Sequence, residues 1–266
     1  MNRTVSSKVF QPPLRLRVAL VLVCLFISPL LPATQSIHLC TESTSFPPYT
    51  YSEIEFLDKP GVLPELINLA ADKLGMDIEY SFAPWKRCIN RLKSGEVDGI
   101  FPIIRTKERI KWGKFPEQPE QRLWPARYTV FVARDSPLQW DGESFRNIRH
   151  GVSAPLGYLT SKKLTAMRVS PNMTINLDMG MRMVSRHRLD GFVFEERAGW
   201  YHAGKIGLES QLRTLPQAFM SENLNVVFNQ KYYQEHKNSL DAFWYELDRF
   251  SRNLPPDLID RYNLKP

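Results

Sequence analysis

The sequence predicts an α/β protein built as two lobes of related design. Between residues 37 and 101 the pattern runs strand, helix, strand, helix, strand, which is typical of a parallel α/β layer. A helix followed by an apolar-Asp-Gly-apolar run occurs at residues 97–101 and again at 189–193. Two β-branched and aromatic segments, 127–134 and 223–228, are predicted as strands that cross between the lobes.

The first lobe is predicted to begin with a short strand at residues 37–40 and a stiff loop at residues 41–51. Two consecutive prolines, Pro47 and Pro48, prevent a regular element in this loop. The loop carries three aromatic side chains, and aromatic side chains mostly serve packing, so these residues alone favour a loop tucked onto the core. They are Phe46, Tyr49 and Tyr51.

Helical apolar spacing then alternates with strands. The spacing predicts a helix over residues 63–74, ended by Gly75, and a strand over residues 76–82. A second helix is predicted over residues 85–92, followed by a strand at residues 97–104.

The second lobe repeats this alternation. We expect strands at residues 150–153 and 189–194 and helices at residues 158–167 and 176–186. An apolar stripe near the C-terminus is predicted to be a helix that packs in the core, although such a stripe also suits a partner surface. The stripe consists of Leu240, Phe243, Trp244, Leu247 and Phe250.

The N-terminus has the features of a secretory signal. Positive charges precede a 14-residue apolar run at residues 18–31, and small or turn-forming residues follow at 32–36. A membrane anchor is the alternative, but a spanning helix needs about 20 residues and this run contains Pro29. We therefore expect a signal peptide over residues 1–36, cleaved near residues 33–36, and a mature protein in the periplasm.

The crossing strands predict a first lobe of residues 37–132 and 222–266 and a second lobe of residues 133–221. The chain has a net charge of +7, and residues 1–36 contribute four positive charges, which leaves +3 for the mature chain. Its basic and acidic residues are interleaved, whereas nucleic-acid binding usually needs a clustered basic face. We therefore expect no nucleic-acid partner.

Two cysteines remain in the mature chain, Cys40 and Cys88. An exported protein folds where disulfides persist, so we expect these two cysteines to form a disulfide. Two unpaired and buried thiols are the alternative.

No catalytic or cofactor motif is present. The chain lacks a Gly-rich phosphate loop, a His-Glu-x-x-His motif, a Gly-x-Ser-x-Gly motif and a cysteine cluster for zinc. We therefore expect no catalytic residues, no metal and no cofactor. Charged residues instead follow predicted strands, at 105–109 in the first lobe and 195–197 in the second, where parallel sheets collect ligands. Opposite charges on the two lobes would suit a zwitterion.

Six segments carry a more specific likeness. They are Phe46-Pro47-Pro48-Tyr49, Gly61-Val62-Leu63-Pro64-Glu65-Leu66, Pro84-Trp85-Lys86-Arg87, Gly95-Glu96-Val97-Asp98-Gly99, Thr106-Lys107-Glu108-Arg109 and Leu189-Asp190-Gly191-Phe192-Val193. In their order and spacing, over nearly the whole mature chain, they resemble bacterial solute-binding protein family 3. That family includes the histidine-, arginine- and glutamine-binding periplasmic proteins.

The resemblance implies a periplasmic binding protein fold with a ligand cleft between the lobes. It implies that Arg109 grips a ligand carboxylate, which a guanidinium can hold bidentately and lysine cannot, and that Glu195 accepts a ligand ammonium. Family members commonly have Asp at the second position, and they have Gly-Thr or Gly-Ser where this chain has Gly157-Tyr158. The other expected ligand contacts are Phe46, Tyr49, Tyr51, Trp85, Phe101, Ile104, Thr106, Gly157 and Tyr158.

The function implied by the resemblance is capture of a small polar solute, an amino acid or a related organic acid, by lobe closure. We expect a monomer that delivers this solute to the membrane component of an ABC importer. Two alternatives are a sensory binding protein that reports to a receptor, and an enzyme of the cyclic-acid dehydratase type on the same scaffold. The enzyme would need an acid–base pair in the cleft, for which Glu195 is the obvious candidate.

Overall fold

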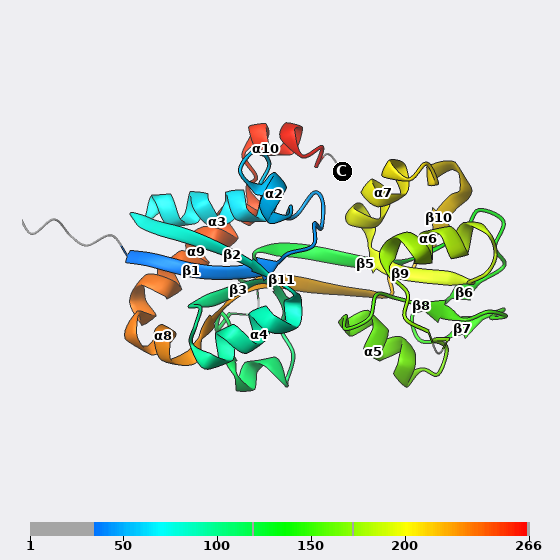
Figure 1. Cartoon of the computed structure of the whole chain (residues 1–266), viewed down its shortest axis with the longest axis horizontal. Coiled ribbons are helices and arrows are strands. Elements are labelled where there is room, and N and C mark those ends of the chain that lie inside the picture. Colours follow the sequence, from blue (N-terminus) through cyan, green and yellow to red (C-terminus); the bar gives the residue numbers. More distant parts are fainter. Residues whose placement is uncertain (1–34, 119, 172, 265–266) are drawn as a thin grey trace, which may run out of the picture. The chain divides into compact units, whose positions relative to one another are not determined.

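A nine-stranded sheet runs through the part of the chain that the structure describes (Figure 1). The computed structural model describes residues 35–118, 120–171 and 173–264. The predicted signal segment therefore lies outside the described residues, except for its last two positions. The main strand order is β2-β1-β3-β11-β5-β9-β8, and β4 and β10 pair with β11 and β5.

The first lobe is built on three parallel strands. β1 (Gln35–Glu42) lies between β2 (Met76–Ala83) and β3 (Gly99–Ile104). α3 (Val62–Lys73) precedes β2, α4 (Trp85–Ser94) precedes β3, and the two helices lie on opposite sides of these strands (Figure 1). This is the strand–helix alternation that the sequence predicts.

The second lobe repeats the design with fewer strands. β8 (Val152–Ser153) and β9 (Gly191–Glu195) are parallel neighbours. α5 (Leu159–Ala166) and α6 (Leu177–Ser185) separate them in the chain and lie where the apolar spacing predicts helices. α7 (Glu196–Lys205) follows β9 directly and is an additional helix that the sequence analysis does not predict.

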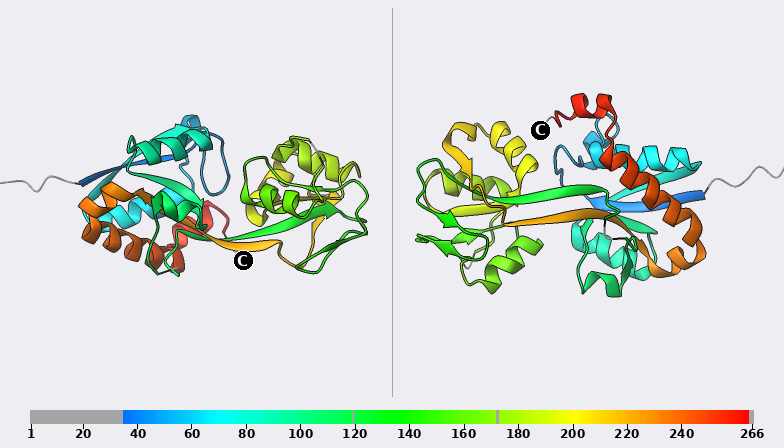
Figure 2. Two further views of the ribbon diagram at one scale, coloured as in Figure 1. Left: turned by 90° about the horizontal axis from the view of Figure 1, so that it is seen from below. Right: turned by 180° about the vertical axis from the view of Figure 1, so that it is seen from behind.

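Two long strands cross from one lobe to the other, as predicted (Figure 2). β5 (Trp124–Ala133) and β11 (Met220–Asn229) are antiparallel to each other. β11 also pairs with β3 of the first lobe, and β5 also pairs with β9 of the second lobe. A single curled sheet is therefore shared by both lobes.

Short elements complete the fold. Each spans too few residues for apolar periodicity to reveal it. They are α2 (Glu53–Phe56), η1 (Arg109–Lys111), β4 (Gly113–Lys114), β6 (Gln139–Trp140), β7 (Phe145–Arg146), η2 (Glu209–Gln211), β10 (Leu212–Thr214), α8 (Gln230–Glu235) and α10 (Pro256–Arg261).

The aspartates of the two Asp-Gly pairs have the same structural role in both lobes. A carboxylate oxygen of Asp98 accepts a hydrogen bond from the backbone N–H of His38 at 2.8 Å. An oxygen of Asp190 accepts three such bonds, at 2.6 to 2.8 Å, from the backbone N–H groups of residues 149–151. Each aspartate therefore fastens a neighbouring backbone segment whose N–H groups would otherwise lack partners. The recurring motif is thus explained by the fold.

The glycines of the same pairs are required by close packing. A Cβ atom on Gly99 would lie 2.7 Å from Cδ2 of Leu39, and one on Gly191 would lie 2.7 Å from Cγ1 of Val130. Both distances are shorter than a van der Waals contact, so any larger residue would push the sheet neighbours apart.

The predicted C-terminal stripe is part of the core. It lies on α9 (Lys237–Arg252), where Leu240, Phe243, Trp244 and Leu247 are at most 2% exposed. Nε1 of Trp244 donates a hydrogen bond to the carbonyl oxygen of Val226 at 3.0 Å, which ties α9 to the crossing strand β11. The core interpretation of this stripe is therefore confirmed.

The predicted disulfide between Cys40 and Cys88 is present, with a Cα–Cα distance of 5.6 Å. It joins β1 to the first turns of α4, and both cysteines are fully buried. The bond therefore fixes the strand end that leads into the 41–51 loop.

We expect loss of this disulfide to destabilise the protein. The two cysteines are 48 residues apart in sequence. Closing a loop of that length reduces the conformational entropy of the unfolded chain, which raises the free energy of the unfolded state by about 4 kcal/mol at room temperature. Urea unfolding of a Cys40→Ala/Cys88→Ala double variant should show a loss of that order. Unfolding midpoints that coincide with those of the unmodified protein would contradict the expectation. Thiol titration of the unfolded, non-reduced chain without residues 1–34 should detect no free cysteine.

Candidate functional site

Strand ends from both lobes lie along the crossing strands, where β3 pairs with β11 and β9 pairs with β5. β1 ends at Glu42 and β3 at Ile104 in the first lobe, and β9 ends at Glu195 in the second. In the register of β5 with β9, Tyr128 stands directly opposite Glu195. The carboxyl ends of parallel strands are where α/β proteins collect ligands, so these residues define the candidate site.

Arg109 supplies the positive charge of this site. Its Nη1 donates a hydrogen bond to the carbonyl oxygen of Ile104 at 2.8 Å, and its backbone N–H donates to Oγ1 of Thr106 at 3.2 Å. Burial lowers the pKa of the guanidinium, although the neighbouring Glu108 opposes this shift. In the described residues no carboxylate forms a salt bridge with Arg109, and Glu108 instead lies 3.8 Å from Nζ of Lys162. A fixed, partly dehydrated cation is therefore left without a counter-ion.

Glu195 is the most deeply buried carboxylate of the site, at 2% exposure. One of its oxygens accepts a hydrogen bond from the hydroxyl of Tyr49 at 2.9 Å. The other accepts from the backbone N–H of Ala198 at 2.9 Å, so Glu195 is also the N-cap of α7. Burial raises the pKa of Glu195 to about 7, although both hydrogen bonds favour the charged form.

A second carboxylate, Glu42, lies at the end of β1. The hydroxyl of Tyr158 donates to its Oε2 at 3.4 Å, and burial raises the pKa of Glu42. Glu42 is absent from the site residues expected from the sequence. No group of three or more His, Cys, Asp or Glu side chains within the described ranges is arranged to hold a metal ion, and the two site carboxylates belong to no such group.

Aromatic rings from both lobes pack beside these charges. Phe46 of the 41–51 loop lies 5.2 Å from Tyr49 and 5.5 Å, edge on, from Phe194 of β9, measured between ring centroids. Tyr49 is fully buried and its ring lies 5.6 Å from that of Trp124. Tyr158 approaches Phe194 at 6.3 Å. The loop is therefore tucked onto the core, as its aromatic residues favour, and it also reaches the second lobe.

The remaining expected ligand contacts have other surroundings. Tyr51 and Phe101 are buried in the hydrophobic core, at 4% and 0% exposure. Trp85 packs in a separate apolar cluster around the disulfide. Gly157 is exposed just before α5 and has a φ of 87°. Tyr51, Phe101 and Trp85 thus have packing roles, and their contacts with a ligand stay predictions.

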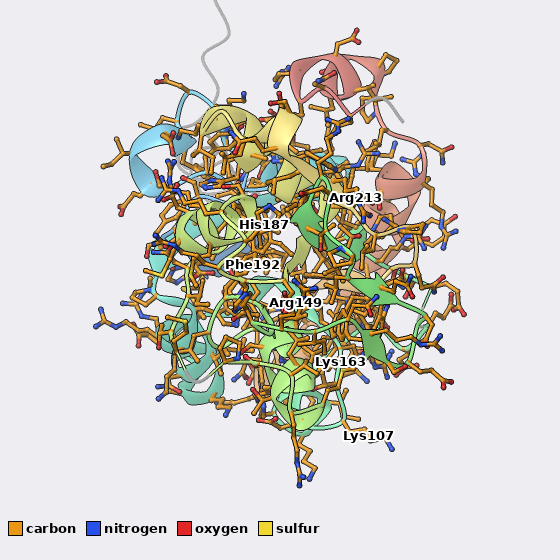
Figure 3. All side chains as sticks on the ribbon, turned by 90° about the vertical axis from the view of Figure 1, so that its right-hand side faces the viewer. Lys107, Arg149, Lys163, His187, Phe192 and Arg213 are labelled. Carbon is orange, nitrogen blue, oxygen red and sulfur yellow. A yellow bond between two sulfur atoms is a disulfide. The ribbon has the colours of Figure 1, made fainter. Side chains whose placement is uncertain are left out.

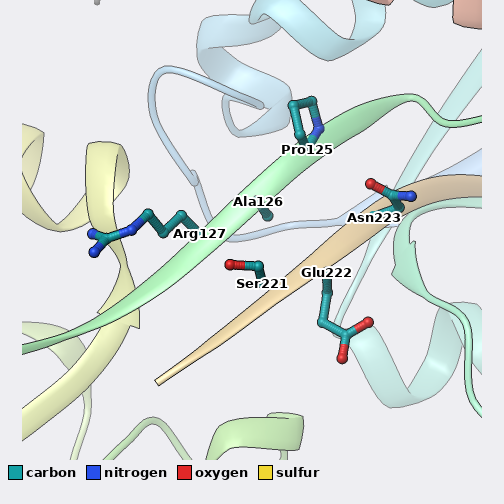
Figure 4. A pocket seen from close by; sticks show the side chains of 6 residues that line it. All are labelled: Pro125, Ala126, Arg127, Ser221, Glu222 and Asn223. Carbon is teal, nitrogen blue, oxygen red and sulfur yellow. The ribbon is translucent and has the colours of Figure 1, made fainter. Parts of the chain in front are cut away.

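Two hollows lie along the crossing strands, and Glu222 and Asn223 line both. Figure 4 shows the first of them. Burial raises the pKa of Glu222, and Lys163 of α5, which Figure 3 labels, opposes that shift. The first hollow is completed by Pro125, Ala126, Arg127 and Ser221, and the second by Arg105, Pro116, Gln118, Gln121 and Asn225. Neither hollow is lined by Arg109 or Glu195.

The sequence profile of the bacterial extracellular solute-binding proteins, family 3, matches residues 37–240. The chain belongs to this family. The predicted family is confirmed, and so is the predicted two-lobed fold with its crossing strands. No curated protein matches this family 3 chain significantly.

Solved structures share the fold of this family 3 protein at low sequence identity. A histidine kinase sensor domain similar to periplasmic binding proteins aligns with a TM-score of 0.68 and 20% identity, over 86% of this chain and 96% of that one. The substrate binding protein of an amino acid ABC transporter aligns with a TM-score of 0.62 and 20% identity, over 86% of this chain and 100% of that one. An ancestral amino acid-binding protein, a precursor of cyclohexadienyl dehydratase, aligns with a TM-score of 0.63 and 17% identity, over 85% of this chain and 95% of that one. These identities establish the fold alone.

Sequence reasoning misses two residues of the candidate site, Glu42 and Tyr128. Glu42 carries a usable signal, because it follows the strand predicted at residues 37–40 as Arg109 follows the strand at 97–104. The sequence around Tyr128 gives no such signal, because its place opposite Glu195 depends on pairing between strands that are far apart in the chain.

The raised pKa of Glu195 predicts a specific pH dependence of stability. In the folded protein this pKa is about 7, whereas the group's ordinary value is 4.5. Between these values the folded state binds the proton more tightly than the unfolded state does. The free energy of unfolding should therefore fall by about 3 kcal/mol through this carboxyl group as pH rises from about 4.5 to 7.

Urea unfolding of the unmodified protein and of Glu195→Gln, measured at intervals between pH 4.5 and 8, tests this. The difference in unfolding free energy between the two proteins should change across this range, because the amide keeps the hydrogen-bond acceptor and does not ionise. A pH-independent difference would show that Glu195 titrates equally in both states.

Proposed function

We propose that this protein captures a small polar solute that carries a carboxylate, by closure of its two lobes, and delivers it to an ABC importer. Membership of solute-binding family 3 supports solute capture, and the structural likeness to the substrate binding protein of an amino acid ABC transporter agrees with delivery to such an importer. The mechanism is a shift between open and closed arrangements that the ligand biases by contacting both lobes.

The observation that carries the proposal is the unpaired charge of Arg109. A partly buried cation without a counter-ion is costly, so a site that retains one is suited to an anion that arrives from outside. One nitrogen of the guanidinium is held by the carbonyl oxygen of Ile104, which fixes the plane of the fork. The remaining N–H groups can then take both oxygens of a carboxylate.

Glu195 and Glu42 are the proposed partners for a cationic group on the solute. They stand at the ends of β9 and β1, one from each lobe. Glu195 already receives hydrogen bonds from Tyr49 and Ala198, so an ammonium group there must share or replace the tyrosine hydroxyl. The aromatic rings of Phe46 and Phe194 would cover the apolar part of the solute.

Two other functions have specific support. A sensory role agrees with the likeness to a histidine kinase sensor domain, and importer genes beside this one would favour transport instead. An enzymatic role agrees with the pKa of Glu195, because an acid–base group works best when its pKa lies near the working pH. Turnover assays on cyclic acids of the aromatic pathway would separate the enzyme from the binding protein.

The location and organisation of the protein complete the proposal. We infer export to the periplasm with cleavage near residues 33–36, and a monomer with lobe boundaries at 37–132, 133–221 and 222–266. The family description, extracellular, agrees with export. In the described part of the chain, no helix has the length and apolar character needed to cross a membrane. N-terminal sequencing of the periplasmic protein decides the cleavage position.

A thermal-shift screen of amino acids and small organic acids, followed by calorimetry, tests the proposed function. Arg109→Ala should weaken binding of a carboxylate solute by about 3 kcal/mol or more, over a hundredfold, because the dry carboxylate loses its partner. Arg109→Lys should also fail, since lysine lacks the bidentate fork. Lys107→Ala, an exposed cation of the same loop, is the matched control and should bind as the unmodified protein does. Unchanged affinity in Arg109→Ala would require another site.

A further inference from the structure

Two tyrosine–carboxylate bonds join the lobes in a reciprocal arrangement. In one, Tyr49 of the first lobe donates to Glu195 of the second, at 2.9 Å. In the other, Tyr158 of the second lobe donates to Glu42 of the first, at 3.4 Å. Each lobe therefore contributes one hydroxyl donor and one carboxylate acceptor to the contacts between the lobes.

Burial makes the Tyr49–Glu195 bond costly to break. Tyr49 is fully buried and Glu195 is 2% exposed. Burial raises the pKa of both tyrosine hydroxyls, so each keeps its proton and remains a donor at neutral pH. A hydrogen bond to a carboxylate in such surroundings is stronger than one between neutral groups. Both bonds join residues of different lobes, so they oppose separation of the residues that they connect.

Further contacts between the lobes lie beside the crossing strands or at the periphery. Arg127 of β5 and Glu196 of α7 form a partly exposed ion pair. The ion pair between Lys162 of α5 and Glu108 is 3.8 Å long and largely exposed, so it contributes little. Nη1 of Arg197 in α7 donates to the carbonyl oxygen of Leu264 at 3.2 Å. Of the two tyrosine–carboxylate bonds, Tyr49–Glu195 is buried and short, whereas Tyr158–Glu42 is part-buried and longer.

We propose that Tyr49–Glu195 and Tyr158–Glu42 form a pair of reciprocal latches that favour the closed arrangement of the lobes whether or not a solute is bound. All four groups belong to the protein, so closure does not need a bridging ligand. Only the identity of the cleft as the binding cleft rests on the proposed function. A solute that brings an ammonium group enters by taking the place of a latch hydroxyl.

Small-angle X-ray scattering of protein that has been unfolded, dialysed and refolded to remove bound solute tests the latches. The unmodified protein should scatter as the structure described here does. A Tyr49→Phe/Tyr158→Phe double variant keeps both rings and loses both donors, so its ratio of open to closed protein should rise about tenfold or more. Tyr49→Phe alone should have the larger effect, because its bond is shorter and more buried.

The matched control is Tyr245→Phe, which removes the hydroxyl of a tyrosine on α9 that is 61% exposed. Its scattering should equal that of the unmodified protein. Arg109→Ala should likewise scatter as the closed form while it loses carboxylate binding, which separates failure of the latches from failure of the proposed function. Identical scattering by the double variant and the unmodified protein, or an extended unmodified protein, would overturn the proposal. If the double variant unfolds at a lower temperature than the unmodified protein, the scattering of the Tyr158→Phe single variant is used for the test instead.

Discussion

The antiparallel pairing of β5 with β11 is the constraint on which the rest of the structure depends. It joins the two lobes into one sheet, because β11 also pairs with β3 of the first lobe and β5 also pairs with β9 of the second. The register of β5 with β9 places Tyr128 beside Glu195. The register of β11 with β3 places Leu224 beside Ile104, the residue whose carbonyl oxygen holds Arg109. A slip of one residue would turn Tyr128 to the opposite face of the sheet. The candidate site is therefore a product of strand register as much as of residue type.

The charged groups of the site differ in the partners that the protein gives them. Both carboxylates have hydrogen-bond donors from the protein itself, and burial raises the pKa of each. The guanidinium of Arg109 has a carbonyl oxygen and no counter-ion in the described residues. The proposed function therefore assigns the anionic group of the solute to Arg109. It makes Glu42 and Glu195 acceptors that exchange one donor for another.

The sequence was most informative where the controlling interactions are local. Apolar spacing places α3, α4, α5, α6 and α9, and the recurring Asp-Gly pairs mark equivalent strands in the two lobes. The loop that ends in Arg109 is also predictable, because it follows a recognisable strand. Contacts between distant segments leave no such trace. The bond from Tyr49 to Glu195 joins residues that are 146 positions apart in the sequence. Tyr51 and Phe101 are buried in the core, and from the sequence alone a core aromatic residue looks the same as one that faces a ligand.

The double engagement of Glu195 restricts how this protein can change its ligand preference during evolution. One carboxylate oxygen caps α7 and the other meets Tyr49, so most substitutions there would damage a helix start as well as the cleft. Glu42, Phe46 and Tyr158 carry no helix-capping hydrogen bond of this kind. Divergence toward new solutes should therefore accumulate at those three positions first, while Glu195 changes slowly for reasons of folding as well as of recognition.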